Sequence, residues 1–107
     1  MRWHSVAFAV SLLVASVAHA ANPATTYRVG IRDFQFQPRQ IVVPVHARVT
    51  WTNHDEEPHI VTSVGDTFHS SPALDTNDHY SATFDKPGTY TYFCSIHPQM
   101  TGTIVVR

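Results

Sequence analysis

The sequence predicts an all-β domain, and three observations support this prediction. No helical pattern of useful length appears after residue 21. Short runs rich in β-branched and aromatic residues alternate instead with Gly, Pro, Asn and Asp. The run 49–53 alternates cleanly, which places Val49, Trp51 and Asn53 on one face of a strand. Seven to eight strands in fewer than 90 residues favour two packed sheets rich in antiparallel pairs, with a small closed barrel as the alternative.

The strands follow one another along the chain with turn residues between them. The turn Asp85-Lys86-Pro87-Gly88, for example, separates two of the last runs. Within the run 89–94, alternation turns Tyr90, Tyr92 and Cys94 to one face, so Phe93 is expected to point outward. The expected strands are 27–32, 34–36, 41–45, 49–53, 59–63, 80–84, 89–94 and 101–106.

The first twenty residues have the layout of a secretory signal peptide. Arg2 precedes an apolar run over 6–17, and Ala18-His19-Ala20 offers small residues at the positions a signal peptidase reads. The run is shorter than the roughly 20 apolar residues that span a bilayer. An uncleaved membrane anchor is the alternative. We therefore expect residues 1–20 to be removed, leaving a domain over 21–107 that is exported to the periplasm and not inserted in a membrane.

Charge and cysteine content narrow the possible functions. Residues 21–107 carry six Lys and Arg against eight Asp and Glu, without the clustering along the chain that typifies nucleic-acid binding. Cys94 is the only cysteine, so no disulfide forms within the chain. A single cysteine in an exported protein indicates an intermolecular bridge, a free thiol or a metal ligand.

The spacing of Cys94, His97 and Met100 favours a metal ligand. A thiolate, an imidazole and a thioether on one short loop between two strands form a soft set of donors that suits copper. Trigonal coordination needs a second imidazole, and His59, which follows Pro58 at the start of an expected strand, is the best candidate. Cys94 as a small buried apolar residue and Met100 as core packing are the simpler alternatives.

The remaining histidines, His46, His54, His69 and His79, lie in polar or turn-like surroundings. A weak surface metal site at His54-Asp55-Glu56 is conceivable, but a solvated loop is the better interpretation.

Residues 27–107 resemble the cupredoxin family, most closely its amicyanin and plastocyanin branch. The matching segments are Phe34-Gln35-Phe36-Gln37-Pro38, Val49-Thr50-Trp51-Thr52-Asn53, Pro58-His59, Phe84-Asp85-Lys86-Pro87-Gly88-Thr89-Tyr90 and Tyr92-Phe93-Cys94-Ser95-Ile96-His97-Pro98-Gln99-Met100. Each match is weak alone, but their order along the chain is specific. The short interval between His97 and Met100 is similar to the loop of amicyanin. The sequence departs from the family at Val45-His46-Ala47-Arg48, where a glycine is usual, and this departure predicts a different turn.

The resemblance implies a Greek-key β-sandwich and a role for each site residue. Cys94, His59 and His97 would form the plane of ligands around one copper ion, with Met100 as a weak axial ligand. Asn53 would bond across to the ligand loop and hold it. Such a protein is not an enzyme but a monomeric one-electron carrier that cycles between Cu(I) and Cu(II). The alternative is periplasmic copper delivery or resistance without electron flow.

The resemblance also implies a docking surface around His97. Its candidate residues are Pro58, Ile96, Pro98 and Gln99. Glu56 and Glu57 would make its edge acidic, which suits a basic or mixed-charge partner such as a c-type cytochrome. A periplasmic dehydrogenase is the other expected class of partner.

Overall fold

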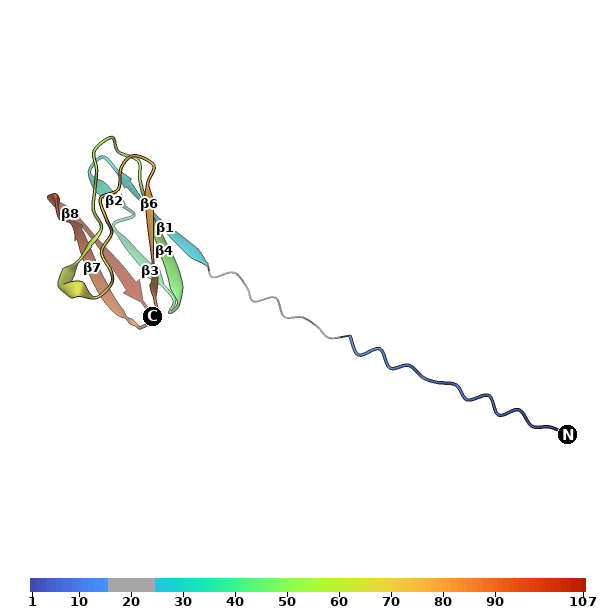
Figure 1. The fold of residues 1–107 in the computed structure, drawn as a ribbon. Helices are drawn as coiled ribbons and strands as arrows, with labels where there is room; N and C mark the ends of the chain where they lie inside the picture. The colour runs from blue at the N-terminus through green and yellow to red at the C-terminus, as the bar shows by residue number, and fades with distance from the viewer. Residues whose placement is uncertain (16–24) are drawn as a thin grey trace.

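The computed structural model describes residues 1–15 and 25–107, and the latter form a β-sandwich (Figure 1). Residues 1–15 have no helix or strand, and the expected cleavage site at 18–20 lies outside the described residues. In the described part of the chain, no helix is long and apolar enough to cross a membrane. The elements are β1 (Thr26–Arg32), β2 (Gln35–Gln37), β3 (Gln40–Val43), β4 (Ala47–Asn53), β5 (Thr62–Ser63), the 3-10 turn η1 (Val64–Asp66), β6 (His79–Phe84), β7 (Gly88–Cys94) and β8 (His97–Val106).

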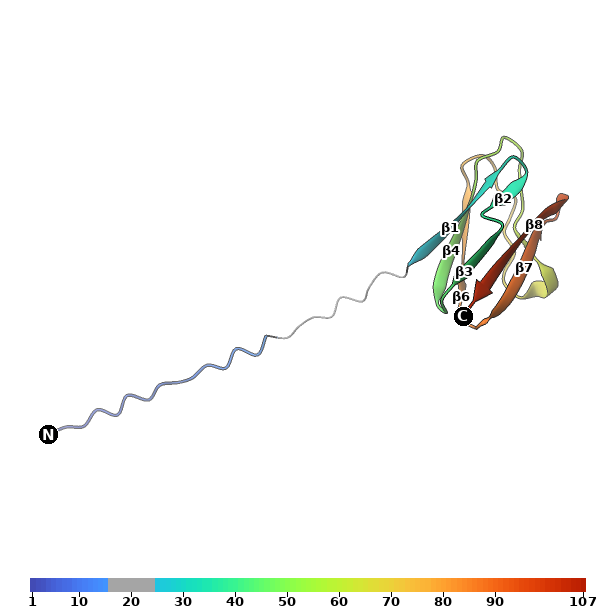
Figure 2. The same ribbon diagram turned by 180° about the vertical axis from the view of Figure 1, so that it is seen from behind.

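The strands form two sheets of four, in the orders β2-β1-β4-β6 and β3-β8-β7-β5. This confirms the expected all-β sandwich and not the alternative of a closed barrel. Most pairs are antiparallel, but β1 pairs with β4, and β3 with β8, in parallel. Figure 2, the view from behind, shows β3 beside β8. Each sheet therefore joins segments that are distant in the sequence.

The core lies between the sheets and is built from their inward-facing positions. As alternation predicted, Val49, Trp51 and Asn53 of β4 are all fully buried. The Trp51 ring meets the Tyr92 ring of β7 edge to face, with centroids 5.3 Å apart. Cys94 is buried on the same face of β7, whereas Phe93 between them is only half buried. Aromatic packing of this kind fixes the spacing of the two sheets where the ligand-bearing loops leave them.

Two expected strands differ from the structure by more than two residues at one end. Instead of a strand over 59–63, only Thr62–Ser63 pairs with β7, while His59 forms an isolated bridge with Leu74. The backbone N–H of Val61 is satisfied by the Ser71 hydroxyl and not by a neighbouring strand. The last strand begins at His97 and not at 101, because the chain reverses over two residues and Cys94 pairs directly with His97.

The turn before β4 also differs from the expectation. Because the sequence lacks the usual glycine there, it predicts a different type of turn. His46 itself adopts the left-handed conformation, with φ of 68°, in place of a glycine. Its N–H donates to the carbonyl of Phe84, and its ring contacts the Asp85 carboxylate at 2.9 Å. The backbone bond to Phe84 helps to offset the strain of positive φ in a residue with a Cβ atom.

Candidate metal centre

Three potential ligands converge at one end of the sandwich. Cys94 ends β7, His97 begins β8, and His59 lies between β4 and β5. The two Nδ1 atoms of His59 and His97 are 3.2 Å apart. The Cys94 Sγ atom lies 3.8 Å from Nδ1 of His59 and 3.7 Å from Nδ1 of His97. The fold therefore brings together the three residues that the sequence predicts as ligands.

The triangle formed by these atoms has the size that one metal ion requires. Sides of 3.2, 3.7 and 3.8 Å place its centre about 2.1 Å from each corner. First-row metal ions bind imidazole nitrogen at about 2.0–2.1 Å and thiolate sulfur at about 2.3 Å. Two imidazoles and one thiolate, with a methionine nearby, are the donors of copper electron-transfer sites. The residues present thus fit a single copper ion in both geometry and chemistry.

The buried ligands are held by backbone contacts as well as by packing. His59 and Cys94 are fully buried, whereas His97 is half exposed. The N–H of His59 donates to the carbonyl of Leu74, whose own N–H donates back to the carbonyl of His59. The N–H of Ile60 donates to the Cys94 sulfur at 3.3 Å, which holds that atom in place. Two of the three donors are therefore fixed before any metal binds.

Met100 lies on β8, three residues after His97. It is 4% exposed and belongs to the hydrophobic core, so packing alone would account for its burial. It also lines a surface cavity of about 310 Å³ with Phe34, Gln99 and other residues beside the site. Its role as an axial ligand stays a prediction from the motif.

Asp55 is a site residue that the sequence analysis missed. One of its carboxylate oxygens lies 2.8 Å from Nε2 of His59. A carboxylate only accepts, so this contact places the proton on Nε2 and leaves the Nδ1 lone pair facing the other donors. Burial raises the pKa of Asp55, but hydrogen bonds from the Phe34 N–H and from His59 outweigh it and hold the pKa below its ordinary value of 3.8. Asp55 is thus an ionised partner of the buried imidazole.

The same carboxylate also holds the turn between β1 and β2. The N–H groups of Asp33 and Phe34 donate to its two oxygens at 2.7 and 2.9 Å. Both turn residues have positive φ, 53° and 58°, as a tight hairpin of this type requires. Asn-Gly is the usual sequence there, so Asp33-Phe34 gave little sign of this turn.

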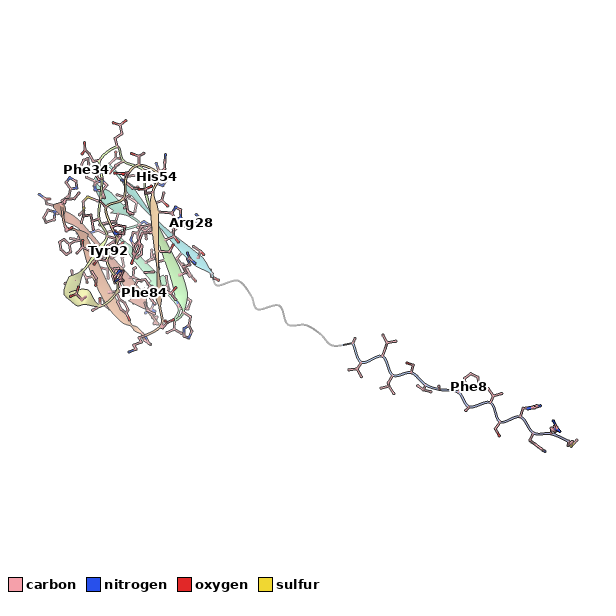
Figure 3. The ribbon with its side chains drawn as sticks, viewed as in Figure 1. Phe8, Arg28, Phe34, His54, Phe84 and Tyr92 are labelled. Atoms are coloured by element: carbon pink, nitrogen blue, oxygen red, sulfur yellow. The ribbon has the colours of Figure 1, made fainter. Side chains whose placement is uncertain are left out.

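This turn places the ring of Phe34 over both imidazoles. Its centroid lies 5.2 Å from that of His59 and 4.9 Å from that of His97, edge to face in both cases. Phe34 remains 46% exposed, so it covers the site from the solvent side. Figure 3 shows Phe34 at the end of the sandwich, above Tyr92 and Phe84 in the core. From the sequence, Phe34 is placed in a strand and in the segment 34–38 that matches the family, but it is given no role at the metal centre.

The position of Asn53 differs in detail from the expectation. Its side-chain amide donates to the carbonyls of Glu57 and Leu74, and its oxygen accepts from the N–H of Asp55. These bonds link β4 to the segment that carries His59, and among the described residues none of them reaches the loop of Cys94 and His97. Asn53 supports the other side of the site from the one expected.

The remaining histidines and the docking candidates are not among the three converging ligands. Among the described residues, the cluster of metal-binding type is His59, Cys94 and His97, and His54-Asp55-Glu56 is not part of it. His46, His54, His69 and His79 are exposed. The docking candidates are also exposed: Pro58, Ile96, Pro98 and Gln99.

Known proteins are similar to this chain in sequence and fold. The family model of the cupredoxin-like domain matches residues 5–106. Amicyanin-alpha of Methylorubrum extorquens is 35% identical over 124 residues, which cover 100% of both chains. The purple cupredoxin of Nitrosopumilus maritimus superposes with a TM-score of 0.71 at 30% identity, over 76% of this chain and 99% of its own.

A copper-containing nitrite reductase from Thermus scotoductus superposes with a TM-score of 0.75 at 29% identity. The match covers 86% of this chain but only 24% of the reductase. The fold, the donor triangle and these matches agree, and the chain belongs to the family of cupredoxin-like domains.

Proposed function

We propose that this chain is a one-electron carrier built on a single copper ion that cycles between Cu(I) and Cu(II). The observation that carries the proposal is the triangle of His59, Cys94 and His97, whose centre lies about 2.1 Å from all three donor atoms. Met100 is the proposed weak axial ligand. The similarity to amicyanin over the whole chain supports the same function.

The residues around the triangle suit electron transfer because they resist movement. Bound copper would supply reversible one-electron chemistry at the site. His59 is held by Leu74 and Asp55, and the Cys94 sulfur by the N–H of Ile60. Because these ligands cannot relax, a change in the oxidation state of copper requires little reorganisation of the site. Little reorganisation keeps the barrier to electron transfer low. His97 is the ligand that reaches the surface, so it offers the shortest exit for an electron.

An enzymatic role has less support. Carrier chemistry transforms no substrate and needs no general base or nucleophile. The nitrite reductase that shares the fold is about four times as long as the matched region, which spans 24% of it. We therefore propose a carrier and not a catalyst.

The proposed location is the periplasm. Residues 1–20 would direct export and be removed, and residues 21–107 would form the soluble, monomeric carrier. The oxidising compartment suits the proposal because a copper-bound thiolate explains the single cysteine, Cys94, without a disulfide.

The proposed docking surface surrounds His97. Ile96 is 50% exposed, and Pro58, Pro98 and Gln99 are exposed beside it. Phe34 adds an exposed aromatic ring that touches His97 itself. A c-type cytochrome or a periplasmic dehydrogenase would bind here in a small, short-lived complex, as redox partners do.

Copper delivery is the competing function, and burial argues against it. His59 and Cys94 are fully buried and Met100 is 4% exposed, so an acceptor could reach the metal only past His97. A carrier should keep Cu(I) in the presence of a competing chelator, whereas a delivery protein should release it.

The test is to add Cu(II) to the mature protein and record its visible spectrum and its voltammogram. We expect an intense blue or purple band and a reversible one-electron wave, both absent from Cys94→Ala. Transfer of Cu(I) to bathocuproine disulfonate is then timed. A colourless wild-type protein would refute the carrier, and rapid loss of Cu(I) from a weakly coloured protein would favour delivery.

A further inference from the structure

A basic depression lies on the outer face of the sheet β2-β1-β4-β6. A shallow depression of about 340 Å³ there is lined by Thr26, Arg28, Arg48, Thr50, Thr52, His79 and Ser81. We call these seven residues the arginine face. They come from β1, β4 and β6, and none of them is acidic or a large apolar residue.

Strand register explains why these residues gather. Arg28 of β1 lies opposite Thr50 of β4, which in turn lies opposite Ser81 of β6. Arg48 is two positions before Thr50 on the same face of β4, so the two arginines are diagonal neighbours. They are twenty residues apart in the sequence, which is why no basic cluster was visible along the chain.

Among the residues that the structure describes, no ion pair balances the positive charge of this face. The ion pairs of the described chain are His46–Asp85 and His59–Asp55, and neither involves an arginine. Arg28 and Arg48 are both exposed. Like charges this close repel each other at ordinary ionic strength, where the Debye length is about 8 Å. A negative surface placed against the face would remove that repulsion.

The face continues towards the metal centre. Gly30 follows Arg28 on β1, and the His54 ring and the Arg32 guanidinium lie beside the space that a side chain at Gly30 would occupy. Arg32 ends β1 and leads into the turn that carries Phe34. Figure 3 shows Arg28 on the flank of the sandwich and His54 near the end where Phe34 lies. A partner seated at the metal centre could therefore extend over this flank.

We propose that the arginine face is a docking surface for an acidic protein, one of the two redox partners of the carrier. The proposal rests on the proposed function, since a carrier must meet both a donor and an acceptor. The face is broad and shallow, with two guanidinium groups, one imidazole and hydroxyls, which suits several carboxylates at once. A lipid surface fits less well. In the folded domain the exposed large apolar side chains are Phe34, Val42, Val45, Val64 and Ile96, none of them on this face.

The test is a titration of the isotope-labelled, copper-loaded and reduced protein with a hexaglutamate peptide, followed by amide chemical shifts. Salt is kept near 10 mM, where the Debye length is about 30 Å. We expect shifts concentrated in β1, β4 and β6 that disappear at high salt. The double variant Arg28→Gln/Arg48→Gln should bind about tenfold more weakly, since two exposed charge pairs are lost.

A matched double variant, Arg39→Gln/Lys86→Gln, removes the same charge away from the face. It should weaken binding by about threefold or less, because at low salt distant charges act on the peptide only through the long-range field. Equal weakening in both double variants, or shifts centred outside the three strands, would overturn the proposal. So would binding to phosphatidylglycerol vesicles through Arg28 and Arg48 without binding of the peptide.

The two proposals fail separately. If the protein is blue and cycles reversibly but does not bind the peptide, the electron-carrier proposal stands and the docking proposal is refuted. If the protein is colourless but binds the peptide through Arg28 and Arg48, the electron-carrier proposal is refuted and the docking of an acidic protein stands.

Discussion

At the scale of single residues, Asp55 links two parts of the site. Its carboxylate accepts three hydrogen bonds, from the N–H groups of Asp33 and Phe34 and from the His59 ring. One side chain thus fixes the tautomer of a buried imidazole and the turn that covers it. Such bonds to an ionised acceptor contribute more than bonds between neutral groups.

Asp55→Asn should therefore destabilise the protein. An amide keeps the shape but offers only one acceptor oxygen, and it lacks the charge. We expect the free energy of unfolding of the metal-free protein to fall by about 2 kcal/mol in urea titrations. Asp85→Asn is the control, because its pair with His46 is 67% and 74% exposed and should change stability by less than about 0.5 kcal/mol. Equal losses in the two variants would show that Asp55 has no special role.

Phe34 sets the polarity around the two imidazoles. Its ring excludes water from their solvent side, and water stabilises the more highly charged Cu(II) state. In the copper-loaded protein, Phe34→Ala should lower the reduction potential, by on the order of 50 mV, or about tenfold in the redox equilibrium. Phe34→Leu keeps an apolar cover and should stay near the wild type. A potential that rises in the alanine variant would contradict this account.

At the scale of elements, the pairing of β7 with β8 depends on a glycine. Tyr92 lies opposite Gly102, and a Cβ atom there would approach the Tyr92 ring to 2.2 Å. The ring cannot move aside easily, because Trp51 and Phe36 pack against it edge to face. The hairpin that carries Cys94 and His97 therefore requires a residue without a side chain at position 102.

Gly102→Ala should destabilise the domain by about 1–3 kcal/mol, the usual effect of overpacking a core. Gly30→Ala is a matched control, because its nearest neighbours would lie at an ordinary 3.7 Å. That variant should be neutral or slightly more stable. Thermal unfolding of both metal-free variants measures the difference, and a stable Gly102→Ala protein would mean that Tyr92 is freer to move than its packing implies.

Elements also show where sequence reasoning succeeded and where it failed. Alternation located Trp51 and Asn53 correctly because both faces of β4 differ sharply in polarity. It failed at 59–61, where a bridge to Leu74 and the Ser71 hydroxyl replace a strand partner. It also missed Asp55 and Phe34. Their roles depend on a turn and a loop that meet only in the folded chain, whereas Cys94 and His97 are neighbours in the sequence.

At the scale of the whole molecule, the bound metal should stabilise the fold as a disulfide does in other small domains. The domain is small, and Cys94 is its only cysteine, so no disulfide connects the two sheets. The donors connect the sheets at a crossover, because His59 lies on the segment that runs from β4 of one sheet to β5 of the other, whereas Cys94 and His97 belong to β7 and β8. Metal binding should therefore stabilise the entire sandwich and not only the loops around it.

Removing copper should lower the melting temperature by at least about 15 °C. A ligand at a thousand times its dissociation constant adds about 4 kcal/mol, and each kcal/mol shifts a domain of this size by about 4–8 °C. Differential scanning calorimetry of loaded and chelated protein measures the shift. Cys94→Ala should show almost none of it. Identical melting of the two wild-type forms would mean that the ion does not couple the sheets.

The bridge between His59 and Leu74 has a consequence for the order in which the chain assembles. Cys94 and His97 meet through a local hairpin, whereas His59 is 35 residues from Cys94 and is placed only when distant segments have met. Closing long loops is slower than closing short ones. We therefore expect a folding chain to acquire two donors early and the third last. Tight metal capture marks the end of folding, and a chain that stops halfway can hold an ion only loosely and exchange it.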